Sequence, residues 1–144
     1  MVLKIIEYGT NEYNKSLELR NKVMRKPLGF NLYDEDLSNE KDAVMIGAFE
    51  NDMIIGVGVM THDDTIYKVE CLCIDFEVQH KGVGGRILEN LEAKAKASGG
   101  KKMCLDARVS AEGFYHKHDY IGSGDTYLHE HAPVPHIAME KNLI

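Results

Sequence analysis

The chain has 144 residues, of which 44% are hydrophobic and 28% charged, with a formal net charge of −6. These values are typical of one soluble globular domain, and the absence of a basic cluster argues against nucleic-acid binding, which depends on neutralising phosphates. No apolar run approaches the roughly 20 residues that cross a bilayer, and the first residues lack the pattern of a secretory signal, so we expect a cytoplasmic protein.

Residue periodicity predicts the elements of the first half of the chain. Apolar residues recur at helical spacing after a cap at Thr10 or Asn11, and Pro27 and Gly29 stop that helix. Turn-forming residues separate the three apolar runs that follow, which favours an antiparallel meander. We expect a strand, a helix, an acidic loop with one helical turn and three strands over residues 2–8, 11–25, 31–41, 43–50, 53–60 and 65–76.

The clearest predicted element of the second half is a helix over residues 83–97, where an apolar stripe lies opposite charged residues. A strand over 101–107, a short helix over 110–117 and strands over 120–126 and 135–141 follow. This order indicates a mixed α/β fold around one sheet, and with no linker or repeat we predict a single domain over residues 1–144. The strand–helix–strand step predicts parallel neighbours, with a ligand site at their carboxyl ends.

The cysteines and histidines predict neither disulfides nor a metal site. The cysteine count is odd, which argues against a disulfide framework, and Cys71 and Cys73 alternate along an apolar strand. We expect them to be buried, reduced thiols on one face of that strand. Two histidine pairs stand two residues apart, but the accompanying spacings of zinc sites are missing, so no metal is expected.

A glycine-rich turn precedes the helix that begins at residue 83. Gly82, Gly84 and Gly85 let the backbone approach a ligand closely, and the first N–H groups of a helix carry partial positive charge without internal partners. Together these features predict a phosphate-binding site, to which Lys81 would add charge. A Rossmann fingerprint fails because Ile87 stands where glycine is needed, and no Gly-Lys-Ser/Thr triplet makes a P-loop.

Two motifs carry a resemblance to a known family. The spacing Gln79-x-x-Gly82-x-Gly84 resembles the acetyl-CoA signature of the GNAT superfamily of N-acetyltransferases, and residues 111–115 (Ala-Glu-Gly-Phe-Tyr) resemble its second signature. The first helix and the C-terminal segment resemble one branch of small stand-alone members, so the resemblance spans essentially the whole chain. It implies an α/β fold with a mixed, mostly antiparallel sheet, in which a central parallel strand pair splays apart, flanked by helices.

Two positions depart from the family pattern. Asp119 stands where the family usually has glycine after the second signature, and aspartate tolerates the left-handed conformation better than most residues, so we expect the turn to survive. Arg108 stands where many relatives have an asparagine that contacts the cofactor. This second departure puts that asparagine contact, but not the fold, in question.

The resemblance implies acetyl-CoA as the acetyl donor. Its pantetheine arm would pair with the strand before the glycine turn, where a backbone N–H would stabilise the oxyanion of the tetrahedral intermediate. Its pyrophosphate would rest on the turn itself. The implied cofactor-binding residues are Leu72, Cys73, Ile74, Gln79, His80, Lys81, Gly82, Val83, Gly84, Gly85 and Arg108.

Acetyl transfer to an amine needs a base and favours an acid. Tyr115 matches the family position of the acid, and a phenol keeps its proton at neutral pH. For the base, Glu70 is the first candidate, because it shares the face of Leu72 and Ile74 if the strand is regular. His136 is the second candidate, because histidine titrates near neutrality.

The acceptor is less defined than the cofactor. The resemblance implies direct transfer to a primary amine of a small molecule or peptide. We expect the variable segments 28–41 and 124–133 to build the acceptor site, and Arg20, Arg25 and His136 to line it. The alternative is a non-catalytic acyl-CoA sensor with the same fold, and a longer acyl donor also stays open. We expect a homodimer, and neither a nucleic acid nor a membrane as partner.

Overall fold

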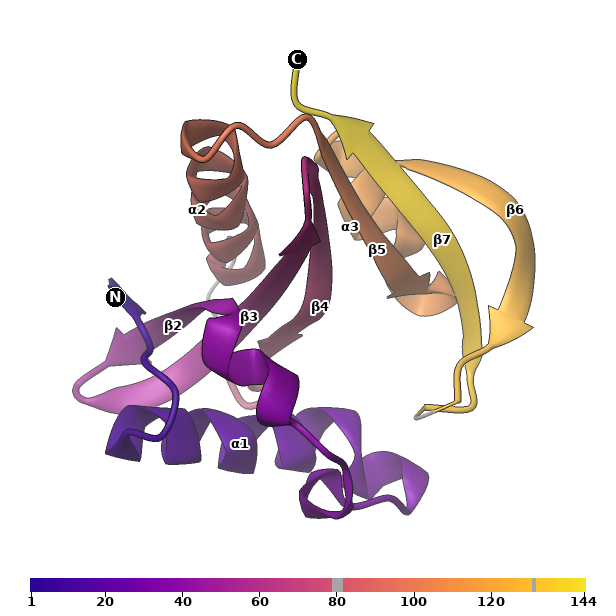
Figure 1. Cartoon of the computed structure of the whole chain (residues 1–144). Coiled ribbons are helices and arrows are strands. Elements are labelled where there is room, and N and C mark those ends of the chain that lie inside the picture. Colours follow the sequence, from indigo (N-terminus) through magenta and orange to yellow (C-terminus); the bar gives the residue numbers. More distant parts are fainter. Residues whose placement is uncertain (79–81, 131) are drawn as a thin grey trace.

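A computed structural model of the chain describes residues 1–78, 82–130 and 132–144 (Figure 1). It contains a seven-stranded sheet in the order β1-β2-β3-β4-β5-β7-β6. Every neighbouring pair is antiparallel except β4 and β5, which are parallel. This confirms the predicted fold class. The strands are β1 (Val2–Ile5), β2 (Val44–Glu50), β3 (Met53–Asp63), β4 (Ile66–Ile74), β5 (Lys102–Arg108), β6 (Ile121–Leu128) and β7 (Pro135–Asn142).

The helices agree with the predicted ones where periodicity is strong. Thr10 caps the first by accepting a hydrogen bond from the Tyr13 backbone N–H. The segment predicted as an acidic loop with one helical turn contains two short 3-10 helices. Asn21 accepts a hydrogen bond from the backbone N–H of Leu32 and so connects this segment to the first helix. The helices are α1 (Asn11–Met24), η1 (Lys26–Leu28), η2 (Leu32–Asp34), η3 (Ser38–Asp42), α2 (Val83–Ala97), η4 (Val109–Ala111) and α3 (Glu112–Lys117).

Two apolar cores lie on the two faces of the sheet. Val57 and Val59 of β3 pack on the side of α1, together with Cys73. The intervening Gly58 faces α2, where an added Cβ would lie 2.6 Å from Ile87 Cγ2. Glycine here lets α2 approach the sheet closely.

The parallel strands β4 and β5 separate partway along their length. They pair from Ile66 opposite Lys102 to Val69 opposite Leu105, and beyond that point β4 has no strand partner on its β5 side within the described residues (Figure 1). A β-bulge marks the same place: Met60 pairs with Val69 and the preceding β3 residue with Cys71, which leaves the intervening residue of β4 unpaired. The predicted splay is therefore present.

The departure at residue 119 is accommodated as expected. Asp119 has a φ of 71°, in the left-handed region. The turn after α3 keeps its geometry without glycine, because the short polar side chain of aspartate tolerates this conformation.

Candidate functional site

A cavity of about 500 Å³ opens between the diverging strands. Its walls come from β4, β5, the C-terminal half of α1, the 3-10 segment after α1, and β7. The predicted residues that line it are Arg20, Arg25, Glu70, Leu72, Arg108, Tyr115 and His136. The fold therefore brings both base candidates, the acid candidate and the three arginines to one cavity.

A smaller cavity of about 210 Å³ adjoins the first one, since both are lined by Leu72, Ala111 and Tyr115. Its lining is mostly apolar and extends to the first turn of α2. Together the two cavities connect the amino end of α2 with the β4–β5 splay. The smaller cavity is lined by Leu72, Ile74, Gly82, Val83, Gly84, Ala111, Phe114 and Tyr115.

The glycines of the predicted phosphate turn have different roles. Gly82 precedes α2 with a φ of 89°, a conformation that favours glycine. Gly84 lines the smaller cavity, and a Cβ there would lie 3.3 Å from the ring of Phe114. Gly85 is buried, and a Cβ there would lie 3.0 Å from the ring of His118, the residue after α3, so glycine here allows close packing.

The remaining cofactor candidates are not among the described residues that line the smaller cavity. Gln79, His80 and Lys81 lie outside the described residues. Cys73 is buried in the core on the α1 side, and Cys71 packs against the same core, so the predicted shared face of these thiols is confirmed. Arg108 lines the larger cavity rather than the smaller one.

Tyr115 lies at the junction of the two cavities and is 8% exposed. Its ring makes edge contacts with Phe114 and Tyr120, at centroid distances of 5.1 and 5.8 Å. Burial, and next the nearby Cys71 thiol, raises the pKa of this phenol. The hydroxyl group therefore stays protonated at neutral pH and is available as a donor.

Glu70 occupies the bulge, so the strand is not regular at this residue. Lys68 lies 3.6 Å from the carboxylate of Glu70 and 3.3 Å from that of Asp106 on β5. Burial raises the pKa of Asp106, but the Tyr127 hydroxyl and Lys68 outweigh it, and the net effect lowers this pKa. Two carboxylates thus share one lysine where the strands begin to part.

His136 is 5% exposed and lies opposite Arg108 in the register of β7 and β5. Its Nδ1 is 2.7 Å from the carbonyl oxygen of Val134. Because a carbonyl only accepts, Nδ1 carries the hydrogen in this contact. In the neutral ring Nε2 is then the acceptor, as a general base requires.

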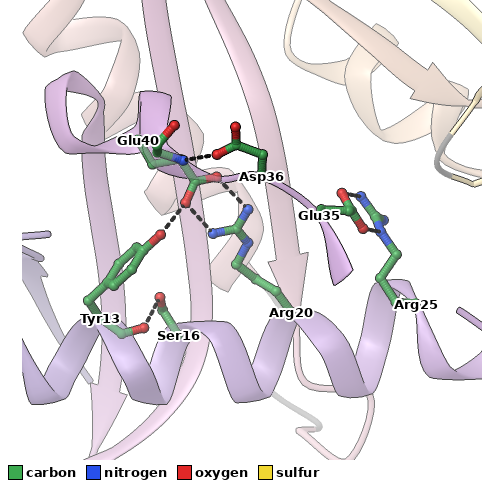
Figure 2. Close-up of polar contacts among 8 residues, drawn as sticks. Tyr13, Ser16, Arg20, Arg25, Glu35, Asp36 and Glu40 are labelled. Atoms are coloured by element: carbon green, nitrogen blue, oxygen red, sulfur yellow. Dashed lines mark hydrogen bonds and ion pairs between the residues drawn. The ribbon is translucent and has the colours of Figure 1, made fainter. Parts of the chain in front are cut away.

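A buried cluster ties the 3-10 segment to α1 (Figure 2). Arg20 donates two hydrogen bonds, of 2.9 and 2.7 Å, to the two carboxylate oxygens of Glu40, and the Tyr13 hydroxyl donates a third, of 2.7 Å. Both charged side chains are 6% exposed. The terminal nitrogens of Arg20 are therefore occupied within the protein.

Arg25 and Arg108 meet at the end of α1. Arg25 forms a bidentate pair with Glu35, at 2.7 and 3.3 Å (Figure 2), and its Nη1 donates to the carbonyl oxygen of Met24 at 3.1 Å. Nη2 of Arg108 donates to that same oxygen, also at 3.1 Å. Two guanidinium groups thus lie side by side in the cavity wall.

Sequence reasoning missed several residues of this cavity. Glu35, Glu40, Lys68 and Asp106 all line it, and each is partnered with a residue that is distant in sequence or on another element. Only the alternation along β5, which puts Asp106 on the face of Arg108, gave a signal in the sequence.

Among residues 1–78, 82–130 and 132–144, no three or more His, Cys, Asp or Glu side chains form a cluster that could hold a metal ion. Cys71, Cys73 and Cys104 are all free thiols. No helix in the described part of the chain is both long and apolar enough to span a membrane.

Comparisons with known proteins agree with this geometry. The model of a family described as "Acetyltransferase (GNAT) domain" matches residues 18–143. No curated protein matches the chain.

Solved structures share the fold at low sequence identity. A putative N-acetyltransferase from Lactobacillus plantarum is 18% identical, with a TM-score of 0.84 over 100% of both chains. An aminoglycoside 6'-N-acetyltransferase complexed with coenzyme A is 15% identical, with a TM-score of 0.81 over 100% of this chain and 98% of the other. The ribosomal-protein-S18-alanine N-acetyltransferase from Escherichia coli is 13% identical, with a TM-score of 0.78 over 99% and 94%.

Proposed function

Because the chain belongs to the GNAT acetyltransferase family, we propose that it transfers an acetyl group from acetyl-CoA directly to a primary amine of a small molecule or peptide. The observation that carries the proposal is the meeting of two cavities at Tyr115, beside a strand that has lost its parallel partner. One cavity would take the thioester arm and the other the amine.

The smaller cavity fits the acetyl donor. Its apolar lining suits a pantetheine arm. Beyond Val69, the edge of β4 that faces β5 would form backbone hydrogen bonds with that arm, as it would with an additional strand. The pyrophosphate would rest at the amino end of α2, from Gly82 to Gly85, with Gln79, His80 and Lys81 beside it. Backbone amides of Leu72, Cys73 and Ile74 would stabilise the oxyanion.

The chemistry assigns one task to each side chain. Glu70 accepts a proton from the ammonium group, directly or through water, and the resulting amine attacks the thioester carbonyl. The tetrahedral intermediate collapses and the thiolate departs, and the excess proton of the amine nitrogen passes to this thiolate, directly or through water, which leaves a neutral amide and the free thiol. Tyr115 donates a hydrogen bond to the departing sulfur; because burial raises its pKa, this donation need not complete a proton transfer.

His136 is the alternative base, since its Nδ1 contact leaves Nε2 as an acceptor in the neutral ring. Glu70 is preferred for its place on the bulge where the cavity begins. Arg20, Arg25 and Arg108 belong to the acceptor side of the cavity. A cytoplasmic location and a homodimer stay predictions.

A non-catalytic acyl-CoA sensor is the competing function. A phenol and a carboxylate in the same cavity support the enzyme, because a sensor needs neither group there. Two of the similar structures are named for different acceptors, an aminoglycoside and a ribosomal-protein alanine. Similarity of fold therefore does not identify the acceptor amine of this chain.

Release of free coenzyme A thiol from acetyl-CoA, measured with a panel of amines, tests the proposal. We expect release that depends on both the enzyme and an amine. Saturable binding of acetyl-CoA without release by any amine would favour the sensor, and absence of binding would contradict both functions.

A further inference from the structure

The larger cavity contains unpaired buried donors. Within the described residues, the buried side-chain nitrogen and oxygen atoms without a hydrogen-bond partner are the Nε atoms of Arg20 and Arg108, and both residues line this cavity. Folded proteins pair nearly all buried donors, because an unpaired one is costly. Both residues therefore bring an unpaired donor to the wall of this cavity, where water or a ligand would supply the acceptor.

The charges around these donors leave a local excess of positive charge. Glu40 neutralises Arg20 and Glu35 neutralises Arg25, whereas the hydrogen bond of Arg108 goes to the neutral carbonyl of Met24. Burial, and next the adjacent Arg25, lowers the pKa of Arg108, as expected for two guanidinium groups close together. An anion bound here would compensate the charge of Arg108.

Another part of the cavity wall carries two carboxylates and one ammonium group. Glu70 and Asp106 share the single ammonium group of Lys68. Asp106 and Arg108 are two residues apart on β5, which corresponds to about 7 Å along a strand. The carboxylate of Asp106 and the guanidinium group of Arg108 therefore come from positions close enough for one small zwitterion to contact both.

We propose that the acceptor is an amine that also carries a carboxylate or phosphate group, and that this group binds at Arg108, with Arg20 as a second donor. The inference rests on the proposed transfer and adds the class of its acceptor. The phosphates of the donor are assigned to the amino end of α2, and Arg108 does not line the smaller cavity that leads there. A purely cationic acceptor would bring no negative charge to the guanidinium group of Arg108, whose hydrogen bond goes to a neutral carbonyl.

Equilibrium binding by calorimetry, with and without saturating coenzyme A, tests the inference. The probes are ω-amino acids from glycine to 6-aminohexanoate, the N-methylamide of each, and phosphoethanolamine. Because a charge-assisted hydrogen bond to a partly buried guanidinium is strong, at least one carboxylate or phosphate probe should bind about tenfold or more tightly than the matching N-methylamide, which keeps the ammonium group but lacks the anion. The better of the carboxylate and phosphate probes identifies the anion.

Arg108→Gln should remove this preference. The matched control is Lys26→Gln, which removes an exposed positive charge beside Arg25 but outside the cavity wall, and should preserve it. Should Arg108→Gln fail to fold, the comparison of acid and amide on the wild-type protein still decides the question. Equal binding of acid and amide, or no binding of either, overturns the inference.

Thiol release from acetyl-CoA with the same probes separates this inference from the proposed function. Acid preference in binding without release by any amine supports the anion site and contradicts the transferase. Release with equal kcat/KM for acid and amide supports the transferase and overturns the inference.

Discussion

Arg108 at the end of β5 donates a hydrogen bond of 3.1 Å to the carbonyl oxygen of Met24 at the end of α1, 84 residues earlier in the chain. This bond joins two walls of the larger cavity across the space between β4 and β5. It holds a half-buried guanidinium group whose hydrogen bond goes to a neutral carbonyl and not to a carboxylate. The site thus depends on long-range contacts as much as on the motifs that predict the fold.

Removal of the Tyr115 hydroxyl tests the proposed donor. Tyr115→Phe should lower kcat about 100-fold or more, because the departing sulfur loses its hydrogen bond, while acetyl-CoA affinity changes little. Tyr120→Phe is the matched control: the Tyr120 hydroxyl donates to Glu92 at 2.7 Å, so its loss should cost about 1 kcal/mol of stability and leave kcat unchanged. Steady-state thiol release measures both, and unchanged turnover in Tyr115→Phe would remove the tyrosine from the mechanism.

Parallel substitution of the base candidates distinguishes them. Glu70→Gln should lower kcat/KM by about 100-fold or more, because glutamine cannot accept a proton from the ammonium group. His136→Gln should lower kcat/KM less than Glu70→Gln does. If His136→Gln lowers kcat/KM more than Glu70→Gln does, and also abolishes the acidic limb of the pH–rate profile, the base is His136.

Arg20 and Glu40 form a buried ion pair. We expect the protein to lose stability when only one of the two charges is removed, and to lose less when both are removed together. Glu40→Leu should lower the free energy of unfolding by about 3–5 kcal/mol, because it leaves a buried guanidinium without its carboxylate. The double variant Arg20→Met, Glu40→Leu should recover part of that loss. Urea denaturation measures both effects.

The exposed pair of Lys4 and Glu12 provides the control for this stability prediction. Lys4→Gln should change the free energy of unfolding by less than about 0.5 kcal/mol, because solvent screens the pair. An equally small effect of Glu40→Leu would mean that the 3-10 segment is not held by this cluster.

The pKa of the Cys71 thiol provides a test of the electrostatics of the larger cavity, which this residue lines. A hydrogen bond from Cys73 lowers the pKa of Cys71; burial opposes this effect, and the charges of Arg20 and Arg25 add to it, so the net shift is downward. Burial raises the pKa of Cys104. A thiol with a lowered pKa is thiolate at lower pH, so alkylation by iodoacetamide should have its midpoint below the ordinary value of about 8.5. Mass spectrometry locates the adduct, and faster labelling of Cys104 would contradict the assigned electrostatics.

The sequence predicted the elements whose bounds are set by residues close together in the chain. The helix over Val83–Ala97 has the predicted bounds, because a continuous apolar stripe lies between a glycine turn and a serine–glycine stop. The first strand ends at Ile5 instead of residue 8, since only its initial residues pair with β2. Strand ends depend on partners that a local pattern does not contain.

The site was only partly predictable from the sequence. The glycine turn and Tyr115 belong to contiguous motifs, and Gly82, Gly84 and Tyr115 line the cavities. The bulge at Glu70 arises from pairing with β3, and Glu40 acquires its role through partners 20 and 27 residues earlier. Such contacts leave no periodicity in the sequence.

Binding of acetyl-CoA to the wild-type protein and to Gly84→Val, measured by calorimetry, tests the central claim most directly. Valine at 84 would fill the smaller cavity against Phe114, whereas Gly113→Ala adds a methyl group in open space and is the matched control. We predict saturable binding by the wild type and the control at or below about 1 mM, and at least about tenfold weaker binding by folded Gly84→Val. No wild-type binding in that range, or equal affinity in Gly84→Val, would contradict the account.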